Sequence, residues 1–393
     1  MSLKLETIAP SKENAISFID LKAQQHNIRS KIDVAIQRVL DHGIYIMGPE
    51  VKELEERLAQ FCGVKYAISC ANGTDALGLV LMAKGIEKGD AIFVPSFTFA
   101  ATAEVVAWVG ATPVFIDSLE DTFNIDPQRL IKGIKRAKEL GLVPRGIIPV
   151  DLFGQPADYD TIQDIADEHN LWVMADAAQS FGGTYKGRKV GSIGDVATTS
   201  FFPAKPLGCY GDGGAIFTND EELATILKSL RVHGQGTDGF YGKYDNIRIG
   251  MNGRLDTLQA AILIEKLNIF DEEIKARQLV AERYNKGLKN IVRTPVVLKD
   301  TLSAWAQYTI VLPEHVKRES LMRSLQEKGI PTVIYYVKPL HLQLAYKNYH
   351  ATTAESLHVC EYLSEAVLSL PMHPYLDENN QSFIIDSLKE YIK

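Results

Sequence analysis

Residues 200–214 read Ser200-Phe-Phe-Pro-Ala-Lys205-Pro-Leu-Gly-Cys-Tyr-Gly-Asp-Gly-Gly214. The segment places Lys205 between a β-rich run and a cluster of glycines. Burial among apolar residues would favour the neutral amine of this lysine, which is the form that makes a Schiff base with a carbonyl. The glycines would let the backbone approach a ligand closely. Taken alone, the segment fits a surface lysine in a glycine-rich turn equally well, so the rest of the chain has to distinguish the two.

The composition indicates a globular chain that binds neither nucleic acid nor membrane. Its 393 residues, 46% of them hydrophobic, suffice for two domains. We expect a large domain with an N-terminal segment over residues 1–265 and a smaller C-terminal domain over 266–393. The net charge of −7 and the lack of a long basic run argue against nucleic acid.

Three further features predict a cytoplasmic protein without a metal site. No stretch approaches the roughly 18 apolar residues of a membrane span. The N-terminus has no apolar leader, and residues 1–14 are expected to be a loose tail. Four scattered cysteines without a C-x-x-C pair argue against a zinc site and against disulfides.

Strand and helix signals alternate through the first half of the chain. Apolar strands are predicted at 66–69, 91–94, 112–117, 146–152, 171–176 and 196–202. Helices are predicted at 18–43, 50–61, 127–140, 160–170 and 221–233. This alternation predicts an α/β fold with a mostly parallel sheet covered on both faces. The remainder predicts one long helix at 255–283, strands at 307–312 and 331–336, and helices at 320–328, 356–368 and 381–392.

Polar residues follow several of the predicted strands, and ligands bind at the carboxyl ends of strands in open α/β sheets. Gly73 and Thr74 open a helix, whose N-terminal N–H groups suit a phosphate, and Ser200 could add a hydroxyl. Asp176 ends an apolar strand, where an unpaired charge is costly, and a protonated pyridine nitrogen would pair with it. Gln179 follows about one turn later. Each of these residues could instead serve only as a helix cap or a strand residue.

A stacking aromatic residue completes the set. Phe97 and Phe99 offer ring faces, although either could belong to the core. Together with Lys205, the strand-end carboxylate and the phosphate-binding helix start, they form what a pyridoxal phosphate site needs. The G-x-G-x-x-G match at Gly234–Gly239 follows a helix instead of a strand, so we reject a dinucleotide site there.

The chain resembles the DegT/DnrJ/EryC1 family of sugar aminotransferases from Phe18 to Tyr375. The motifs that carry the resemblance are Gly48-Pro-Glu-Val, Ala71-Asn-Gly-Thr-Asp-Ala-Leu, Asp176-Ala-Ala-Gln-Ser, the 200–214 segment and Asn252-Gly-Arg-Leu-Asp-Thr-Leu-Gln-Ala-Ala. The resemblance implies the type I fold of pyridoxal-phosphate enzymes, similar to aspartate aminotransferase. Within the family, the chain looks most similar to enzymes that use L-glutamate to aminate C3 of UDP-3-oxo-N-acetylglucosaminuronate for bacterial O-antigen in lipopolysaccharide.

The resemblance also implies roles for the residues that bind pyridoxal phosphate. Lys205 would be the Schiff-base lysine and proton shuttle, and Asp176 would pair with the pyridine nitrogen. Gln179 would lie against the ring near its 3-hydroxyl. The phosphate would be bound by Thr74 and Ser200 beside Gly73, and Phe99 would stack on the ring.

Substrate contacts and a shared active site are implied in the same way. Asn252 would reach the phosphate of the neighbouring subunit's cofactor, so the enzyme would be a homodimer, with the 234–250 loop crossing the interface. Arg254 would contact a carboxylate of the sugar or the donor. Tyr335 and Tyr336 would contact the sugar, although many relatives have His-Tyr at these two positions.

Two alternatives stay open at this point. The substrate could be a dTDP- or UDP-linked 3- or 4-keto deoxyhexose, with the same chemistry. The protein could also be a non-catalytic regulator that binds the cofactor or a sugar nucleotide.

Overall fold

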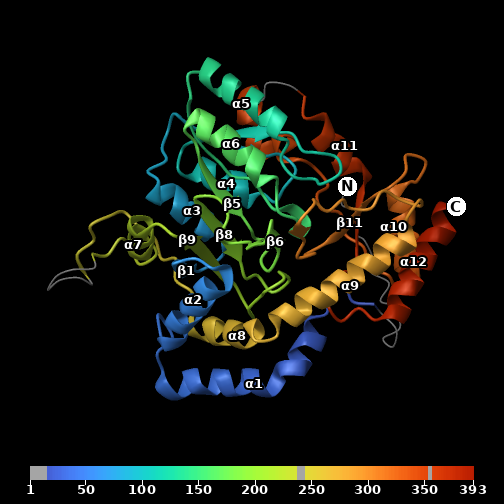
Figure 1. The fold of residues 1–393 in the computed structure, drawn as a ribbon, viewed down its shortest axis with the longest axis horizontal. Coiled ribbons are helices and arrows are strands. Elements are labelled where there is room, and N and C mark those ends of the chain that lie inside the picture. The colour runs from blue at the N-terminus through green and yellow to red at the C-terminus, as the bar shows by residue number, and fades with distance from the viewer. Residues whose placement is uncertain (1–15, 237–243, 353–355) are drawn as a thin grey trace, which may run out of the picture.

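A seven-stranded sheet lies at the centre of the computed structural model, which describes residues 16–236, 244–352 and 356–393 (Figure 1). The predicted N-terminal tail lies outside the described residues. The strand order is β1-β9-β8-β5-β4-β2-β3. The strands are β1 (Tyr66–Cys70), β2 (Asp90–Pro95), β3 (Thr112–Ile116), β4 (Val143–Ile147), β5 (Trp172–Asp176), β8 (Val196–Ser200) and β9 (Gly214–Thr218). All neighbours pair in parallel except β9, which is antiparallel to both β1 and β8. The predicted mostly parallel sheet is therefore confirmed.

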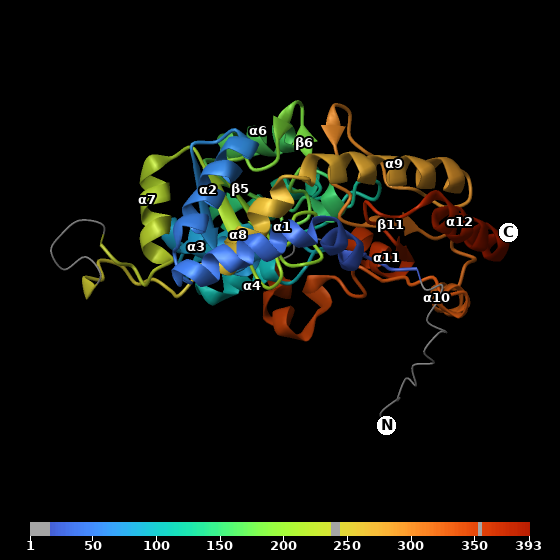
Figure 2. The same cartoon turned by 90° about the horizontal axis from the view of Figure 1, so that it is seen from below.

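Helices cover both faces of this sheet, because successive strand side chains point to opposite sides. On one face, Ile92 and Val94 belong to an apolar cluster shared with α3 (Gly73–Ala83), α4 (Ala101–Trp108) and α7 (Glu221–Leu230). On the other face, Phe93 packs in a cluster with α2 (Pro49–Cys62), α5 (Pro127–Glu139), α6 (Tyr159–His169) and α8 (Thr257–Leu267). The N-terminal helix α1 (Leu21–His42) lies along α8 (Figure 2).

The prediction of one long helix over residues 255–283 is wrong. The segment forms α8 and α9 (Phe270–Leu288), which meet at an angle (Figure 1). The first turns of α9 bury Phe270 and Ile274 in the large-domain core, whereas its later turns bury Tyr284 and Leu288 in the C-terminal core. The break between α8 and α9 contains no glycine or proline that would mark it in the sequence. It arises because the segment packs on two different cores. The predicted domain boundary at 265/266 falls near the end of α8.

The C-terminal part is a smaller α/β unit. Its strands β11 (Tyr308–Val311) and β12 (Val367–Leu370) pair antiparallel. Its helices are α9, α10 (Arg318–Glu327), α11 (His358–Ala366) and α12 (Glu378–Ile392). Short elements complete the described chain: β6 (Thr184–Tyr185), β7 (Arg188–Lys189), β10 (Thr301–Leu302), and 3-10 turns at Leu152–Gly154, Leu340–Leu342 and Leu344–Thr352.

Three further element predictions are wrong in detail. The helix predicted over 356–368 ends at Ala366, because residues 367–370 pair with β11. The strand predicted over 331–336 is reduced to one bridge between Val333 and Ser369. The strand predicted over 146–152 ends at Ile147 as β4. Each depends on a pairing partner distant in the sequence, which local apolar periodicity does not reveal.

Candidate active site

A cavity of about 750 Å³ opens at the carboxyl edge of the large sheet. It is lined by the segments that follow β1, β2, β5 and β8, and these four strands run in the same direction. The C-terminal unit adds Gln307, Tyr335 and Tyr336 from the opposite side, and Ile19 enters from the N-terminal segment. Nearly all of the residues predicted for the site line this one cavity: Gly73, Thr74, Phe99, Asp176, Gln179, Ser200, Lys205, Tyr335 and Tyr336.

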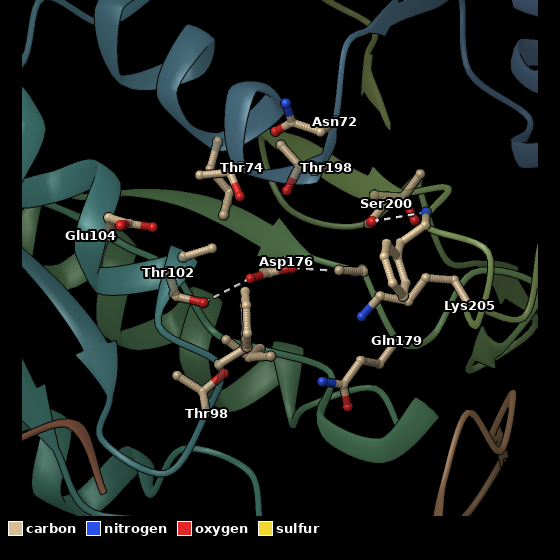
Figure 3. Close-up of a pocket in the computed structure, with 18 of the residues that line it drawn as sticks. Asn72, Thr74, Thr98, Thr102, Glu104, Asp176, Gln179, Thr198, Ser200 and Lys205 are labelled. Atoms are coloured by element: carbon tan, nitrogen blue, oxygen red, sulfur yellow. Dashed lines mark hydrogen bonds between the residues drawn. The ribbon is translucent and has the colours of Figure 1, made fainter. Parts of the chain in front are cut away.

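Asp176 places a buried carboxylate at the end of β5, with 5% of the residue exposed. One oxygen accepts a hydrogen bond from the Thr102 hydroxyl at 2.9 Å, and the other accepts from the Ala178 N–H at 3.2 Å (Figure 3). Burial raises the pKa of Asp176, while these two bonds and the positive charge of Lys205 lower it. The described residues 177–183 directly after Asp176 form turns instead of a helix, so Asp176 is not the helix cap that we considered from the sequence.

Lys205 extends from the loop after β8 toward Asp176 and Gln179 (Figure 3). Burial lowers the pKa of its amine, and the charge of Asp176 opposes that shift. The site therefore favours the neutral, nucleophilic form of the lysine more than water does. The choice between a surface lysine and a cavity lysine is settled in favour of the cavity.

The N-terminus of α3 forms the part of the cavity suited to a phosphate. Asn72 caps the helix by accepting from the Asp75 N–H at 2.7 Å, and the helix begins at Gly73 as the sequence predicted. Thr74 in the first turn faces the cavity (Figure 3). A side chain at Gly73 would put its Cβ 2.7 Å from the Ser200 Cβ, so only glycine allows the helix start to lie this close to β8.

Gln179 connects the two sides of the cavity. Its side-chain oxygen accepts from the Phe153 N–H at 2.6 Å, and its amide nitrogen donates to the Tyr336 hydroxyl at 3.1 Å. Because the Phe153 N–H can only donate, it fixes which end of the amide faces Tyr336. Burial raises the pKa of Tyr336, so this phenol remains protonated at neutral pH.

The two candidate aromatic residues have different environments. Phe99 is 57% exposed and lines the cavity, so its ring is accessible to a ligand. Phe97 is fully buried and packs edge-on against Phe153 and Tyr336. Phe97 is therefore a core residue.

Asn252 and Arg254 do not line the cavity in the described part of this chain. Asn252 is exposed. The Gly253 carbonyl between the two residues accepts from the Ala71 N–H at 3.1 Å, which places the segment beside the end of β1. The Nε atom of Arg254 is buried and has no hydrogen-bond partner among the described residues.

Sequence reasoning missed several polar residues of the cavity. Thr102 supports Asp176, and Asn72 caps α3. Buried side-chain oxygens of Thr98, Thr198 and Gln307 line the cavity without a hydrogen-bond partner in the described structure. Thr98 and Thr102 flank Phe99, so their position after a predicted strand was a usable signal. The place of Gln307 depends on how the two domains pack, which the sequence does not show.

The rejected dinucleotide motif contains no strand–turn–helix unit in its described part. Residues 234–236 are separated by three residues from the end of α7 at Leu230, and residues 237–239 lie outside the described residues. No group of three or more His, Cys, Asp or Glu residues that could hold a metal ion occurs within residues 16–236, 244–352 and 356–393.

Comparison with known proteins gives concordant results. A model described as the DegT/DnrJ/EryC1/StrS aminotransferase family matches residues 26–389. A relative from Pseudomonas aeruginosa, UDP-2-acetamido-2-deoxy-3-oxo-D-glucuronate aminotransferase, is 51% identical over 376 residues, covering 95% of this chain and 99% of the relative.

Solved structures give the same result. One of a DegT DnrJ EryC1 StrS aminotransferase from Brucella abortus has a TM-score of 0.92 and 52% identity, covering 96% of this chain and 99% of that one. A crystal structure of NtdA from Bacillus subtilis with bound cofactor PMP has a TM-score of 0.86 and 28% identity, covering 98% of this chain and 86% of that one.

Proposed function

The chain belongs to the DegT/DnrJ/EryC1/StrS aminotransferase family, and from this premise we propose that it transfers the amino group of L-glutamate to C3 of UDP-linked 3-oxo-N-acetylglucosaminuronate. The family, the type I fold, the aminotransferase activity and the pyridoxal phosphate cofactor predicted from the sequence are confirmed. The product would be a diamino-uronic sugar nucleotide for O-antigen. The observation that carries the chemistry is that Lys205 and Asp176 face one cavity from neighbouring parallel strands.

The residues of the cavity fit pyridoxal phosphate. The buried carboxylate of Asp176 suits the protonated ring nitrogen, and the α3 N-terminus with Thr74 and Ser200 suits the phosphate. The exposed ring face of Phe99 suits stacking. When bound, this cofactor withdraws electrons from the bonds at the substrate carbon and carries the amino group from donor to acceptor.

Lys205 is the base and acid of the proposed reaction. As a neutral amine it would take the proton from Cα of glutamate and pass it to the cofactor carbon C4′, and in the second half-reaction it would take a proton from C4′ and deliver it to C3 of the sugar. Burial favours the neutral form, and the Asp176 charge keeps the amine basic enough to be protonated in turn.

Asp176 would hold the proton on the ring nitrogen of the bound cofactor by its negative charge. Bonds from Thr102 and Ala178 fix the carboxylate in the plane that faces the cavity and oppose the effect of burial on its pKa. Both donors are uncharged, so the carboxylate keeps its full charge for the ligand. Gln179 lies beside this pair and fits the role of a contact to the ring near its 3-hydroxyl.

Tyr335 and Tyr336 fit contacts to the sugar, because they line the cavity from the smaller domain opposite Lys205. The unpartnered buried oxygens of Thr98, Thr198 and Gln307 could accept further donors of the ligands. The 51% identity to a relative named for the 3-oxo-glucuronate sugar supports this substrate. The His-to-Tyr difference at Tyr335 favours the alternative of a different keto-sugar.

A homodimer with shared active sites accounts for Asn252 and Arg254, which do not line the cavity of their own chain. Their segment would serve the partner's site, where the carboxylate of a substrate would pair with the guanidinium. Three apolar residues in the described part of the chain after α7 are exposed: Tyr244 by 82%, Ile247 by 54% and Ile249 by 89%. Such a surface fits an interface between copies. The predicted crossing loop includes residues 237–243, which lie outside the described residues.

We propose that the enzyme is cytoplasmic, because its proposed substrates, L-glutamate and a sugar nucleotide, are those of a cytoplasmic enzyme. None of the helices in the described residues has the length and apolar character needed to cross a membrane.

The experiment that tests this function is a visible absorption spectrum of the purified protein before and after L-glutamate. We expect a band from the lysine-bound cofactor that bleaches with glutamate and is absent in Lys205→Ala. Lys52→Ala, at a side chain that is 82% exposed, is the matched control and should behave as wild type. A band that glutamate does not change would refute the donor.

A panel of keto-sugars linked to UDP or dTDP then identifies the acceptor by the mass of the aminated product. The fastest turnover with the UDP-3-oxo-uronate supports the proposal. Preference for a keto deoxyhexose would identify a different sugar substrate and leave the proposed transamination unchanged. Absence of turnover with every donor and acceptor would favour the non-catalytic regulator.

A further inference from the structure

Asp151 is a fully buried carboxylate directly behind the active site, and the proposed reaction does not use it. It follows β4, and its backbone N–H donates to the Asp176 carbonyl at 3.0 Å. Its side chain accepts three hydrogen bonds: from the Ala157 N–H at 2.9 Å, the Tyr159 hydroxyl at 2.7 Å and the Ser180 hydroxyl at 2.6 Å. These donors come from two segments of the chain, residues 157–159 and the turn that contains Ser180.

The segments that Asp151 joins meet at Gln179. Ser180 is the next residue after Gln179, so the bond to Ser180 anchors the turn that carries the glutamine. The bond to Ala157 closes the other turn, over residues 152–157. In that turn Phe153 donates to the Gln179 oxygen at 2.6 Å. One carboxylate therefore fixes both the backbone beside Gln179 and the group that orients its amide.

The 152–157 turn needs such an anchor, because its backbone is unfavourable by itself. Phe153 has a φ of 60°, in the left-handed region that non-glycine residues seldom adopt. Gly154 has a φ of 110°, and a Cβ there would lie 2.5 Å from the Trp305 nitrogen. This backbone path aims the Phe153 N–H at Gln179, and the bond from the Ala157 N–H to Asp151 helps to hold the turn in place.

We propose that Asp151 is the positioning residue for Gln179, and that it fixes the amide so that its nitrogen faces Tyr336 and the cavity. The inference rests on the role in cofactor contact proposed for Gln179. Asp151 itself does not line the cavity, so it acts through the glutamine.

The carboxylate form of Asp151 is the form that suits this role. Burial raises the pKa of Asp151 to about 7, the bonds from Ser180, Tyr159 and Ala157 lower it, and the charge of Asp176 raises it slightly. Tyr159 from α6 and Asp176 from β5 are the titratable groups in its surroundings. The carboxylate form accepts all three donors, whereas the protonated form has one acceptor position fewer.

A double-mutant cycle between Asp151 and Gln179 tests the inference. The variants are Asp151→Ala, Gln179→Ala and the combination, and the readouts are kcat, KM for both substrates and the visible band of the bound cofactor. We expect Asp151→Ala to lower kcat about tenfold, with the KM values changed less than about twofold. The combined variant should be no slower than Gln179→Ala, because Asp151 has no effect once its target is removed.

Two more variants separate positioning from folding. Asp151→Asn keeps an acceptor for Ala157 and a group that bonds Ser180, so it should recover kcat to within about threefold of wild type. Asp117→Asn, at another buried carboxylate outside the cavity, should leave kcat of the folded enzyme unchanged. If Asp151→Ala does not fold, Ser180→Ala removes a single bond of the network and enters the same cycle.

The outcomes distinguish the inference from the proposed function. Independent, multiplicative losses in the combined variant, or a wild-type kcat in Asp151→Ala, would overturn the positioning role alone. A wild-type kcat in Gln179→Ala would overturn the role of the glutamine and the inference with it. Failure of the wild-type protein to transaminate would overturn the proposed function itself.

Discussion

Asp176→Asn should make the cofactor-free protein more stable while it removes most of the activity. The aspartate is 5% exposed, and burial raises its pKa against the effect of its bonds and of Lys205. Asparagine fits the same surroundings, because its oxygen can accept from the Ala178 N–H and its nitrogen can donate to the Thr102 hydroxyl. The substitution removes a buried charge and leaves both the Ala178 N–H and the Thr102 hydroxyl with a hydrogen-bond partner. We therefore expect the free energy of unfolding at neutral pH to rise by about 1–3 kcal/mol.

The size of this gain should depend on pH. The pKa of Asp176 is raised in the folded state. The stability that its carboxyl contributes is therefore fully present below the unfolded-state pKa and is lost as the pH rises through the folded-state pKa. The difference in Tm between Asp176→Asn and wild type should therefore grow as the pH rises from the unfolded-state pKa of an aspartate, about 3.9, through the raised folded-state pKa. Thermal unfolding of the cofactor-free proteins, followed by circular dichroism, measures it.

Asp117→Asn is the matched control, and its effect on stability should have the opposite sign. Asp117 is 1% exposed and accepts from the Val359 and Cys360 N–H groups at the start of α11. Both groups can only donate, so an amide nitrogen there would face a donor and cost about 1–3 kcal/mol.

Activity provides the second half of the test. The kcat of Asp176→Asn should fall at least about a hundredfold, because the amide cannot hold the ring-nitrogen proton by charge. The reasoning would be refuted by a cofactor-free variant no more stable than wild type, or by a variant that keeps more than about a tenth of the wild-type kcat.

Three other changes test the remaining parts of the site. Gly73→Ala should weaken cofactor binding and cost about 1–3 kcal/mol of stability, because its Cβ would lie 2.7 Å from the Ser200 Cβ. Cofactor titration and urea unfolding measure the two effects. An unchanged affinity would contradict phosphate binding at the N-terminus of α3. Lys205→Ala and Asn252→Ala, each inactive alone, should regain about a quarter of wild-type activity when mixed and reassociated. About half of the dimers are then mixed, and each mixed dimer has one intact site of two. No recovery would place Asn252 at the site of its own chain. Tyr335→His should change KM for the sugar nucleotide by more than about threefold and leave KM for glutamate within twofold, as steady-state kinetics would show; equal changes in both would remove Tyr335 from the sugar subsite.

The residues that the sequence located correctly are those whose role follows from a local rule. Gly73, Asp176 and Ser200 lie at strand ends, and parallel strands bring their carboxyl ends to one edge of a sheet. Lys205 cannot be assigned from its own segment, which fits a surface turn equally well, and is located through the family resemblance whose motifs include that segment. Strand ends and motifs are properties of a continuous stretch of chain, so they can be recognised without knowledge of the packing.

The residues that the sequence missed depend on contacts between distant segments. Thr102 meets Asp176 across 74 positions, and Asp151 meets Ser180 across 29. The same reason explains the missed strand β12, which pairs with a segment about 60 residues earlier in the chain. The break between α8 and α9 arises because one amphipathic segment packs on two cores. None of these features has a signature within its own segment.

Asp176 and Lys205 do not stabilise the cofactor-free fold in their charged forms, although the proposed chemistry needs both residues. This contrast supports a functional role for both. Burial raises the pKa of Asp176 and lowers the pKa of Lys205, so the folded protein opposes the charged form of each. A fold under selection for stability alone would lose nothing by replacing either residue with an uncharged one of similar size. Their presence in one cavity is explained by a ligand that pairs with the carboxylate and reacts with the neutral amine. The cofactor of this family has both properties.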